Sequence, residues 1–269
     1  MKIAVVQMQS TSDLEKNLTV MRQFVEQAKA RGADIVVFPE VAYFTGAPEQ
    51  SAAVAPEYSR LKKLFGDWAK DLEITLVPGT LREPHGPSGV HSNTLLVFDP
   101  AGKVVAEYRK IFLFKATLPD RQYDETKFFQ PGSQLVTVEV AGATLGLSIC
   151  FDLRFPELFR ALKKRGAQVI LLPAAFTAQT GKAHWETLLR ARAIENQCFV
   201  VASGLVGTAG DGGAKYGHSL VVGPWGDILV DLNDREGLEV WDVDLSEISQ
   251  CAQRVDTWGS RREDLFPIG

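Results

Sequence analysis

The hydrophobic pattern at the start of the chain predicts a strand, a helix and a second strand. Residues 2–8 form a short apolar run typical of a buried strand. An apolar stripe at helical spacing follows, made of Leu14, Leu18, Met21, Val25 and Ala28. Ser12 and Glu15 have the spacing of a capping box for this helix, and Gly32 marks its end. A second apolar run, residues 33–39, completes the unit at a proline.

The same order of elements recurs in the second half of the chain. Residues 144–150 indicate a buried strand, residues 156–165 a helix that begins with a proline, and residues 166–173 another strand. The two units share a local sequence, since residues 29–39 match residues 163–173, both beginning with lysine, containing Arg-Gly-Ala and ending in proline. Two such units predict a fold with pseudo-twofold symmetry in which each half contributes a sheet.

The rest of the chain alternates strand and helix signals and then pairs strands as hairpins. We predict a helix near residues 183–197, and loops at residues 82–89 and 207–213. Further strands are predicted at residues 74–80, 93–98, 104–108, 198–203, 219–222 and 228–232. This order indicates an α/β protein with mixed sheets. Because no linker is long enough to divide the chain, we expect residues 1–269 to form a single domain.

Composition excludes several classes of function. A chain of 269 residues with 45% hydrophobic content can bury a large core, and its net charge of −4 gives no support for nucleic-acid binding. No apolar segment reaches the length of a membrane span, and the first apolar run is too short for a signal peptide. The three cysteines are far apart and odd in number. This argues against a disulfide framework or a zinc site and favours a reducing, cytoplasmic setting with no metal or cofactor.

Three reactive side chains each follow an apolar strand. Glu40 comes after residues 35–39, Lys110 after residues 104–109, and Cys150 after residues 144–149. Because ligands bind at the carboxyl ends of strands in such sheets, we expect these groups to meet. A thiol can attack a carbonyl or nitrile carbon, a carboxylate can move protons, and an ammonium can stabilise a developing oxyanion. Taken singly, each has a plainer interpretation as a buried thiol, a turn cap or a surface charge.

Three blocks of sequence around these residues resemble the signature blocks of the nitrilase superfamily of carbon–nitrogen hydrolases. They are residues 38–40, 108–114 and 149–157, and the similarity continues through residues 125–132, 176–181, 184–196 and 216–219. The resemblance covers nearly the whole chain in the right order. It implies a four-layer αββα sandwich, which also accounts for the internal repeat.

The resemblance implies a role for each residue of the cluster. Cys150 is the nucleophile, Glu40 is the general base and then the general acid, and Lys110 stabilises the tetrahedral intermediate. Glu125 orients Lys110 or the substrate nitrogen, and the backbone N–H of Phe151 completes the oxyanion hole. The expected reaction is amide hydrolysis through a thioester, with release of ammonia or an amine. The sequence leaves the resting protonation state of the thiol open.

The residues around this set look most like the branch of deaminated glutathione amidases and ω-amidases, which act on small amides that carry a carboxylate. Ala175 and Phe176 belong to that pattern and are expected to contact the substrate, and residues 115–123 are expected to border the pocket. Arg154 either pairs with the substrate carboxylate or bridges to Asp152 or Glu157. Carbamoylputrescine-type amidases and true nitrilases share the reactive trio and are the alternatives within the superfamily.

Two other classes of protein compete with an amidase. A thiol redox protein would need neither Glu40 nor Lys110 beside its cysteine, and a catalytically idle binding partner has no use for three matched reactive groups. The expected ligand is therefore a small-molecule amide. Residues 258–266 occupy the family's position for packing across a subunit interface, and their apolar and arginine side chains are many for a free end. We therefore expect a homodimer.

Overall fold

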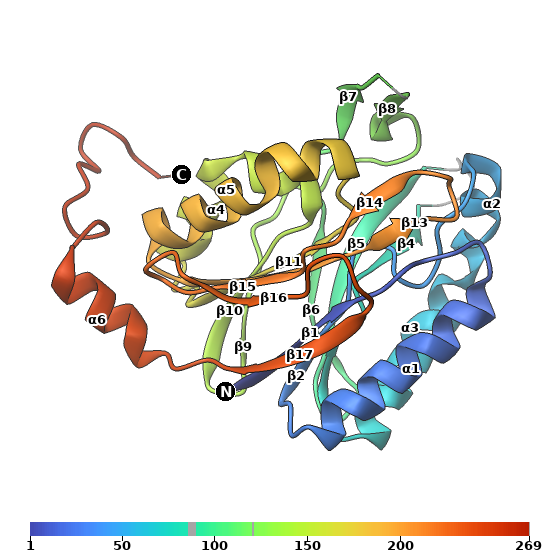
Figure 1. Ribbon diagram of the computed structural model, residues 1–269, viewed down its shortest axis with the longest axis horizontal. Helices are drawn as coiled ribbons and strands as arrows, with labels where there is room; N and C mark the ends of the chain where they lie inside the picture. Colours follow the sequence, from blue (N-terminus) through green and yellow to red (C-terminus); the bar gives the residue numbers. More distant parts are fainter. Residues whose placement is uncertain (86–89, 120, 269) are drawn as a thin grey trace.

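Two β-sheets lie face to face at the centre of the protein, and helices cover both outer faces (Figure 1). The computed structural model describes residues 1–85, 90–119 and 121–268. The first sheet has the order β17-β1-β2-β3-β5-β4, with β6 paired to β5. Its strands are β1 (Lys2–Gln7), β2 (Ile35–Val37), β3 (Thr75–Val77), β4 (Thr80–Pro84), β5 (His91–Phe98), β6 (Val104–Arg109) and β17 (Gly237–Asp242).

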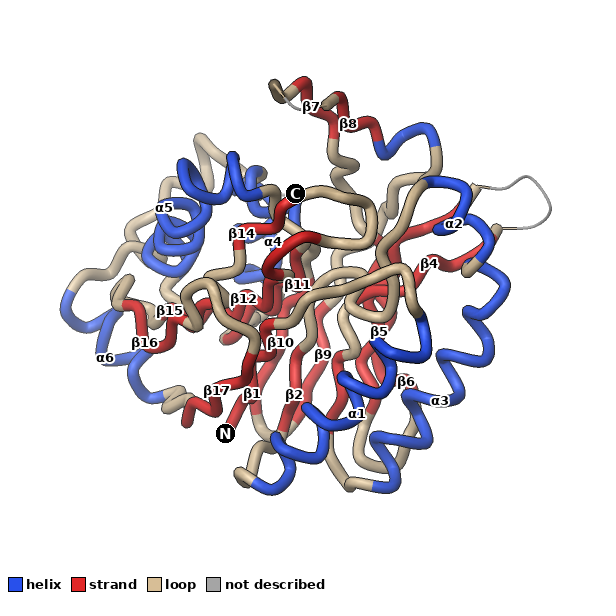
Figure 2. Tube along the Cα trace, turned by 45° about the vertical axis from the view of Figure 1, so that its right-hand side comes forward, coloured by secondary structure: helices blue, strands red, loops and turns tan. Residues whose placement is uncertain are grey.

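The second sheet has the order β16-β15-β12-β11-β10-β9. Its strands are β9 (Thr137–Val140), β10 (Ala143–Leu147), β11 (Val169–Ala174), β12 (Phe199–Gly204), β15 (Leu220–Val222) and β16 (Ile228–Asp231). Figure 2 shows the strands of both sheets running between the helices of the two outer layers. The helices are α1 (Leu14–Ala30), α2 (Pro48–Ala53), α3 (Tyr58–Asp71), α4 (Pro156–Lys164), α5 (Ala178–Asn196) and α6 (Ser246–Arg254).

The core follows from the alternation of side chains along the strands. On β1, Ile3 and Val5 point into the space between the sheets, whereas Ala4 and Val6 join the cluster under α1 and α3. A third cluster lies under α4 and α5. Because every central strand is apolar on both faces, the molecule has three apolar layers between four layers of secondary structure. The predicted αββα sandwich is confirmed.

The internal repeat is also confirmed. In the first unit β1 and β2 are parallel neighbours joined by α1, and in the second β10 and β11 are parallel neighbours joined by α4. The two prolines that end the repeats, Pro39 and Pro173, therefore bring equivalent strand ends to the cavity described below. This symmetry places Glu40 and Ala175 next to each other, with the Ala175 N–H donating to Glu40 at 2.9 Å.

Several local predictions were wrong. The N-cap of α1 is Asp13 and not Ser12, because the Asp13 carboxylate accepts the Lys16 N–H at 3.0 Å. The helix predicted at residues 183–197 begins at Ala178, where the Thr177 hydroxyl caps it.

The predicted strand 74–80 is two strands. β3 and β4 are separated at Gly79, whose φ of +81° breaks the extended chain. The loop predicted at 82–89 begins as part of β4, and its residues 86–89 lie outside the described residues.

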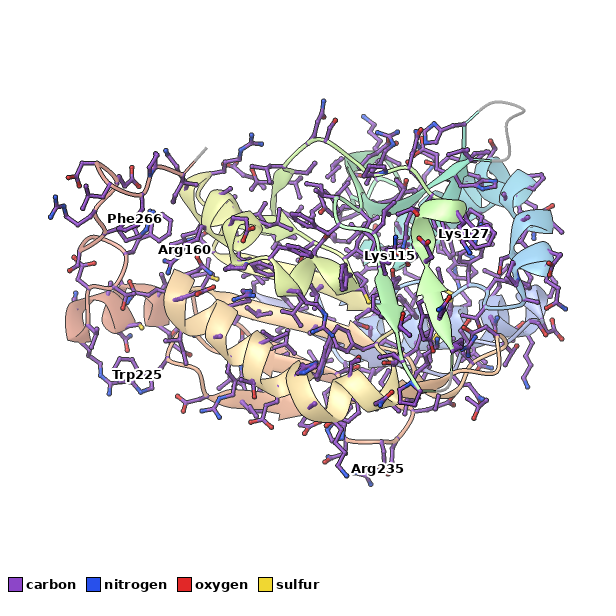
Figure 3. All side chains as sticks on the ribbon, turned by 90° about the horizontal axis from the view of Figure 1, so that it is seen from above. Lys115, Lys127, Arg160, Trp225, Arg235 and Phe266 are labelled. Atoms are coloured by element: carbon purple, nitrogen blue, oxygen red, sulfur yellow. The ribbon has the colours of Figure 1, made fainter. Side chains whose placement is uncertain are left out.

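Two hairpins lie outside the main sheets. The predicted loop 207–213 is mostly a hairpin turn between β13 (Val206–Thr208) and β14 (Ala214–Tyr216), whose strands pair with each other. A second hairpin joins β7 (Lys115–Thr117) to β8 (Gln122–Asp124), close to the labelled side chains of Lys115 and Lys127 (Figure 3). None of the helices in the described ranges is long and apolar enough to cross a membrane.

Candidate active site

A cavity of about 300 Å³ opens where strands from both sheets end, and the predicted site residues line it together. This volume lies at the lower end of the range of small-molecule pockets. The predicted residues on its walls are Glu40, Lys110, Glu125, Cys150, Phe151, Arg154, Ala175 and Phe176. Within the described residues, no group of three or more His, Cys, Asp or Glu side chains is placed to hold a metal ion.

Cys150 lies at a sharp turn between β10 and α4. It begins the short 3-10 helix η4 (Cys150–Arg154), and its φ of +46° lies in the left-handed region, which a non-glycine residue rarely adopts. Strained conformations of this kind are frequent at functional sites. The turn places Cys150 beyond the carboxyl end of β10 and before α4, in agreement with the prediction that it follows an apolar strand.

Asp152 links this turn by hydrogen bonds to the segment around Tyr108 and Phe112. Its buried carboxylate accepts the Ile149 N–H at 2.9 Å and the Tyr108 hydroxyl at 2.6 Å, and it also accepts the Phe112 N–H at 3.0 Å. Burial, which these hydrogen bonds only partly offset, raises the pKa of Asp152 to about 6. Asp152 therefore joins the turn that carries the thiol to the segment that carries Lys110.

Lys110 is almost completely buried between two carboxylates. Its Nζ lies 2.9 Å from Glu40 Oε1 and 2.9 Å from Glu125 Oε2. Glu125 is itself held by the backbone, since its Oε2 accepts a hydrogen bond from the Phe114 N–H at 2.7 Å. An ammonium has three N–H donors, so a third remains for a substrate oxygen. Glu125 thus makes the contact with Lys110 that one of its two predicted roles requires.

Glu40 is held by three donors besides the thiol. Lys110 Nζ donates to it, Asn93 Nδ2 donates at 2.7 Å, and the backbone N–H of Ala175 donates at 2.9 Å. The Cys150 thiol lies close enough to the same carboxylate for each group to act on the pKa of the other. Each carboxylate oxygen therefore has a fixed direction, and Glu40 faces the proton that a base must remove.

The electrostatics of the cluster favour a neutral thiol and an ionised Glu40. Burial and the Glu40 charge hold the pKa of Cys150 far above its usual range, and Lys110 opposes this only in part. Burial also acts to raise the pKa of Glu40, but the Lys110 charge and the hydrogen bonds prevail and lower it. Burial would lower the pKa of Lys110, yet Glu125 and Glu40 raise it well above its usual value. The proton therefore rests on sulfur, beside an ionised base.

The wall near Cys150 is aromatic and carries one guanidinium. Arg154 lies 5.7 Å from the Phe151 ring centroid and 5.2 Å from that of Phe176, and its Nη1 is 3.3 Å from His184 Nδ1. Within the described ranges Arg154 makes no ion pair with a carboxylate, so the bridge to Asp152 or Glu157 is not formed. Ala175 contributes its N–H to Glu40.

Sequence reasoning missed the residues that hold the cluster in place. Asn93 donates to Glu40, and Tyr108 and Asp152 hold the turn that carries Cys150. Gly79 is also required: a Cβ there would lie 1.8 Å from the Pro39 carbonyl oxygen, next to Glu40. The sequence predicts the strands at whose ends Asn93 and Tyr108 lie, but it does not show that these side chains hydrogen-bond to Glu40 and Asp152.

Comparison with known proteins identifies the family. The carbon–nitrogen hydrolase family matches residues 2–253. The chain belongs to this family. This hydrolase is 34% identical to a deaminated glutathione amidase of Dictyostelium discoideum and 34% identical to the omega-amidase NIT2 of Homo sapiens. Each match covers 99% of the present chain, with 96% and 97% of the respective relative.

A fusion relative and two solved structures extend the comparison. The hydrolase is 38% identical to the nitrilase and fragile histidine triad fusion protein NitFhit of Caenorhabditis elegans, over 99% of this chain but 62% of the relative. The NitFhit crystal structure matches with a TM-score of 0.94 at 37% identity, over 99% of this chain and 66% of that one. The present chain thus spans less than two thirds of the fusion protein.

The second structure is a mutant of the amidase from Nesterenkonia sp. AN1. It shows the result of Michael addition of acrylamide at the active-site cysteine, and it matches with a TM-score of 0.83 at 30% identity. The match covers 99% of the hydrolase and 98% of that chain.

Proposed function

We propose that this hydrolase cleaves the C–N bond of small amides that carry a carboxylate, through a thioester on Cys150. The observation that carries the proposal is the buried contact of the Cys150 thiol, the Glu40 carboxylate and the Lys110 ammonium at one cavity. The names of the relatives, deaminated glutathione amidase and omega-amidase, support an amide as substrate. So does the Nesterenkonia amidase, whose active-site cysteine carries an added acrylamide.

Acylation begins with transfer of the thiol proton to Glu40. The Cys150 sulfur attacks the amide carbon, and the oxygen that becomes negative lies against Lys110 Nζ and the Phe151 N–H. The intermediate collapses when Glu40 returns the proton to the nitrogen, so that the C–N bond breaks and ammonia or an amine leaves. The acyl group remains on Cys150 as a thioester.

Hydrolysis of the thioester uses the same groups in reverse. Glu40 takes a proton from water, and the resulting hydroxide attacks the thioester carbon. The C–S bond then breaks, the sulfur recovers the proton from Glu40, and the carboxylic acid is released. Each turnover consumes one water molecule and regenerates the resting thiol.

The position of Arg154 is the reason for proposing that the acyl part of the substrate carries a carboxylate. It follows the nucleophile in the same short helix, lines the cavity and has no carboxylate partner in the described part of the chain. A guanidinium can bind a carboxylate through two parallel hydrogen bonds, which an ammonium cannot do.

Replacing Arg154 by lysine is expected to raise KM for carboxylate-bearing amides about tenfold while changing kcat by less than about threefold. The reason is that this contact forms before the transition state. Steady-state assays of amine or ammonia release would measure both constants. An unchanged KM, or neutral amides that outperform acidic ones in the native enzyme, would remove the specificity claim and leave the reaction class.

We also propose that the protein works as a cytoplasmic homodimer, with residues 1–269 as one catalytic domain. Leu265 is 60% exposed and Phe266 is 72% exposed, which is more apolar surface than a free tail requires. Figure 3 shows Phe266 near Arg160 of α4, and both residues border a groove between α4 and the tail. Light scattering is expected to give twice the chain mass of 29.5 kDa. A monomer at micromolar concentration would contradict the dimer.

The buried free cysteines Cys198 and Cys251 suit a reducing compartment.

A further inference from the structure

Asn93 is a polar residue in the buried interior of the first sheet. It lies in β5, all eight residues of which are buried, and it is itself 3% exposed. Asparagine is depleted in strands, and a buried amide costs free energy unless both its donor and its acceptor are paired. Among the described residues, the Asn93 Oδ1 atom has no hydrogen-bond partner. Strand formation and packing therefore do not explain this side chain.

The Asn93 side chain contacts the proposed base. Its Nδ2 donates to Glu40 Oε1 at 2.7 Å, which is shorter than the 2.9 Å hydrogen bonds that Glu40 accepts from Lys110 and Ala175. The backbone carbonyl of Asn93 also accepts the Lys110 N–H at 2.9 Å. Asn93 thus holds Glu40 through its side chain and Lys110 through its backbone. A side-chain substitution removes the first contact and leaves the second in place.

The donors are divided unequally between the two oxygens of Glu40. Oε1 accepts from Asn93 Nδ2 and from Lys110 Nζ, whereas Oε2 accepts from the Ala175 N–H. Each carboxylate oxygen has about two lone-pair sites. The two donors therefore occupy Oε1, and Oε2 keeps a site for a proton. The Cys150 thiol, which lies close enough to act on the pKa of Glu40, can use that site.

We propose that Asn93 is a positioning residue for the general base, and that it occupies Oε1 of Glu40 so that Oε2 alone exchanges protons. In acylation, Oε2 takes the proton of the Cys150 thiol and gives it to the nitrogen as the C–N bond breaks. In hydrolysis of the thioester, Oε2 takes a proton from water and returns it to the sulfur. This inference rests on the proposed amidase mechanism and adds a residue that acts through Glu40.

Asn93→Leu removes the donor and keeps a side chain of similar size. We expect kcat to fall about 10- to 100-fold, because Glu40 is no longer held in one orientation, with KM changed by less than about threefold. The hydrogen bond from Asn93 also lowers the pKa of Glu40. Its loss raises that pKa, so the acid limb of kcat/KM should move to higher pH. Assays of ammonia or amine release over a series of pH values would measure both effects.

Asn93→Asp is a second variant of the same size. It replaces the donor by a carboxyl group that faces Glu40, so the acid limb should move to still higher pH than in Asn93→Leu. Within the described residues, the titratable groups that face Glu40 are Lys110, Cys150 and, beyond Lys110, Glu125, and neither variant changes them. A loss of packing alone would not place the acid limbs in this order.

Asn196 offers a matched control. It is also fully buried, its Nδ2 donates to the Arg192 carbonyl oxygen at 2.9 Å, and its Oδ1 has no partner in the described structure. It does not line the cavity. Asn196→Leu should therefore leave kcat and the acid limb unchanged, even if the variant unfolds at a lower temperature. A folded Asn93→Leu enzyme that keeps either the native acid limb or a kcat within about threefold of native would overturn the inference.

A chemical probe keeps the inference testable if no amide is hydrolysed. In that case the proposed function fails, and alkylation of Cys150 by iodoacetamide replaces the rate assay. The S–C bond forms, iodide leaves, and the thiol proton passes to Glu40. Mass spectrometry of the peptide that contains Cys150 gives the alkylation rate at each pH.

An acid limb of alkylation that lies at higher pH in Asn93→Leu than in the native protein would still support the role of Asn93, and identical acid limbs would overturn it. If Asn93→Leu does not fold, Asn93→Asp decides both assays in the same way. An acid limb of Asn93→Asp at or below the native pH would contradict the inference.

Discussion

Replacing Cys150 by alanine is expected to abolish amide hydrolysis, to below about one part in 10⁴ of the native kcat, because the variant lacks the thiol that forms the acyl intermediate. Amine or ammonia release from a carboxylate-bearing amide would measure the loss. The matched controls are Cys198→Ala and Cys251→Ala. Both residues are buried away from the cavity and should leave most of the activity. Full activity in Cys150→Ala would end the covalent mechanism.

Replacing Lys110 by methionine is expected to lower kcat at least about 10²-fold, the usual loss when one oxyanion donor is removed. Methionine keeps much of the length of the side chain but has no charge and no N–H. Lys110 is 1% exposed and separates Glu40 from Glu125, so its removal also leaves a buried and a partly buried carboxylate facing each other. Such a change is destabilising, and thermal unfolding of the variant must accompany the rate measurement.

The pH dependence of Lys110→Met distinguishes an electrostatic role from a loss of folding. In the native protein the Lys110 charge helps to keep the pKa of Glu40 below its usual value, so the base stays ionised well into the acid range. Without that charge, burial dominates and the pKa of Glu40 rises. The acid limb of kcat/KM should therefore move to higher pH in the variant. A folded Lys110→Met enzyme with native kcat and an unmoved acid limb would show that Lys110 is not the oxyanion partner.

The reactive groups could be predicted from the sequence because each stands beside a local signal. Cys150 lies between an apolar run and a proline that opens a helix, and Glu40 and Lys110 follow apolar strands. Asn93 and Asp152 carry no such signal. Asn93 contacts Glu40 across 53 residues of sequence, and Asp152 contacts Tyr108 across 44. Hydrogen bonds between distant segments depend on how the sheets pack, which periodicity does not report.

The same limit explains which parts of the fold were missed. The repeat and the long apolar strands were evident, but β7 and β8 each have three residues, too few to show alternation. β17 completes the first sheet by pairing with β1 from the other end of the chain. By contrast, α3 could have been predicted, because Leu61, Phe65 and Trp68 are buried at helical spacing. The predicted N-cap of α1, Ser12, was wrong by one residue, because the neighbouring Asp13 is an equally good N-cap residue.

The proposed mechanism requires that an acyl group is transferred from the amide to Cys150. Acid quenching of the native enzyme during steady-state turnover, followed by mass spectrometry of the peptide that contains Cys150, tests it most directly. We expect an added mass equal to the acyl group without its amine, the same for amides that share an acyl group, and absent from Cys150→Ala. Product release with no adduct, or an adduct on another residue while Cys150→Ala stays active, would contradict it.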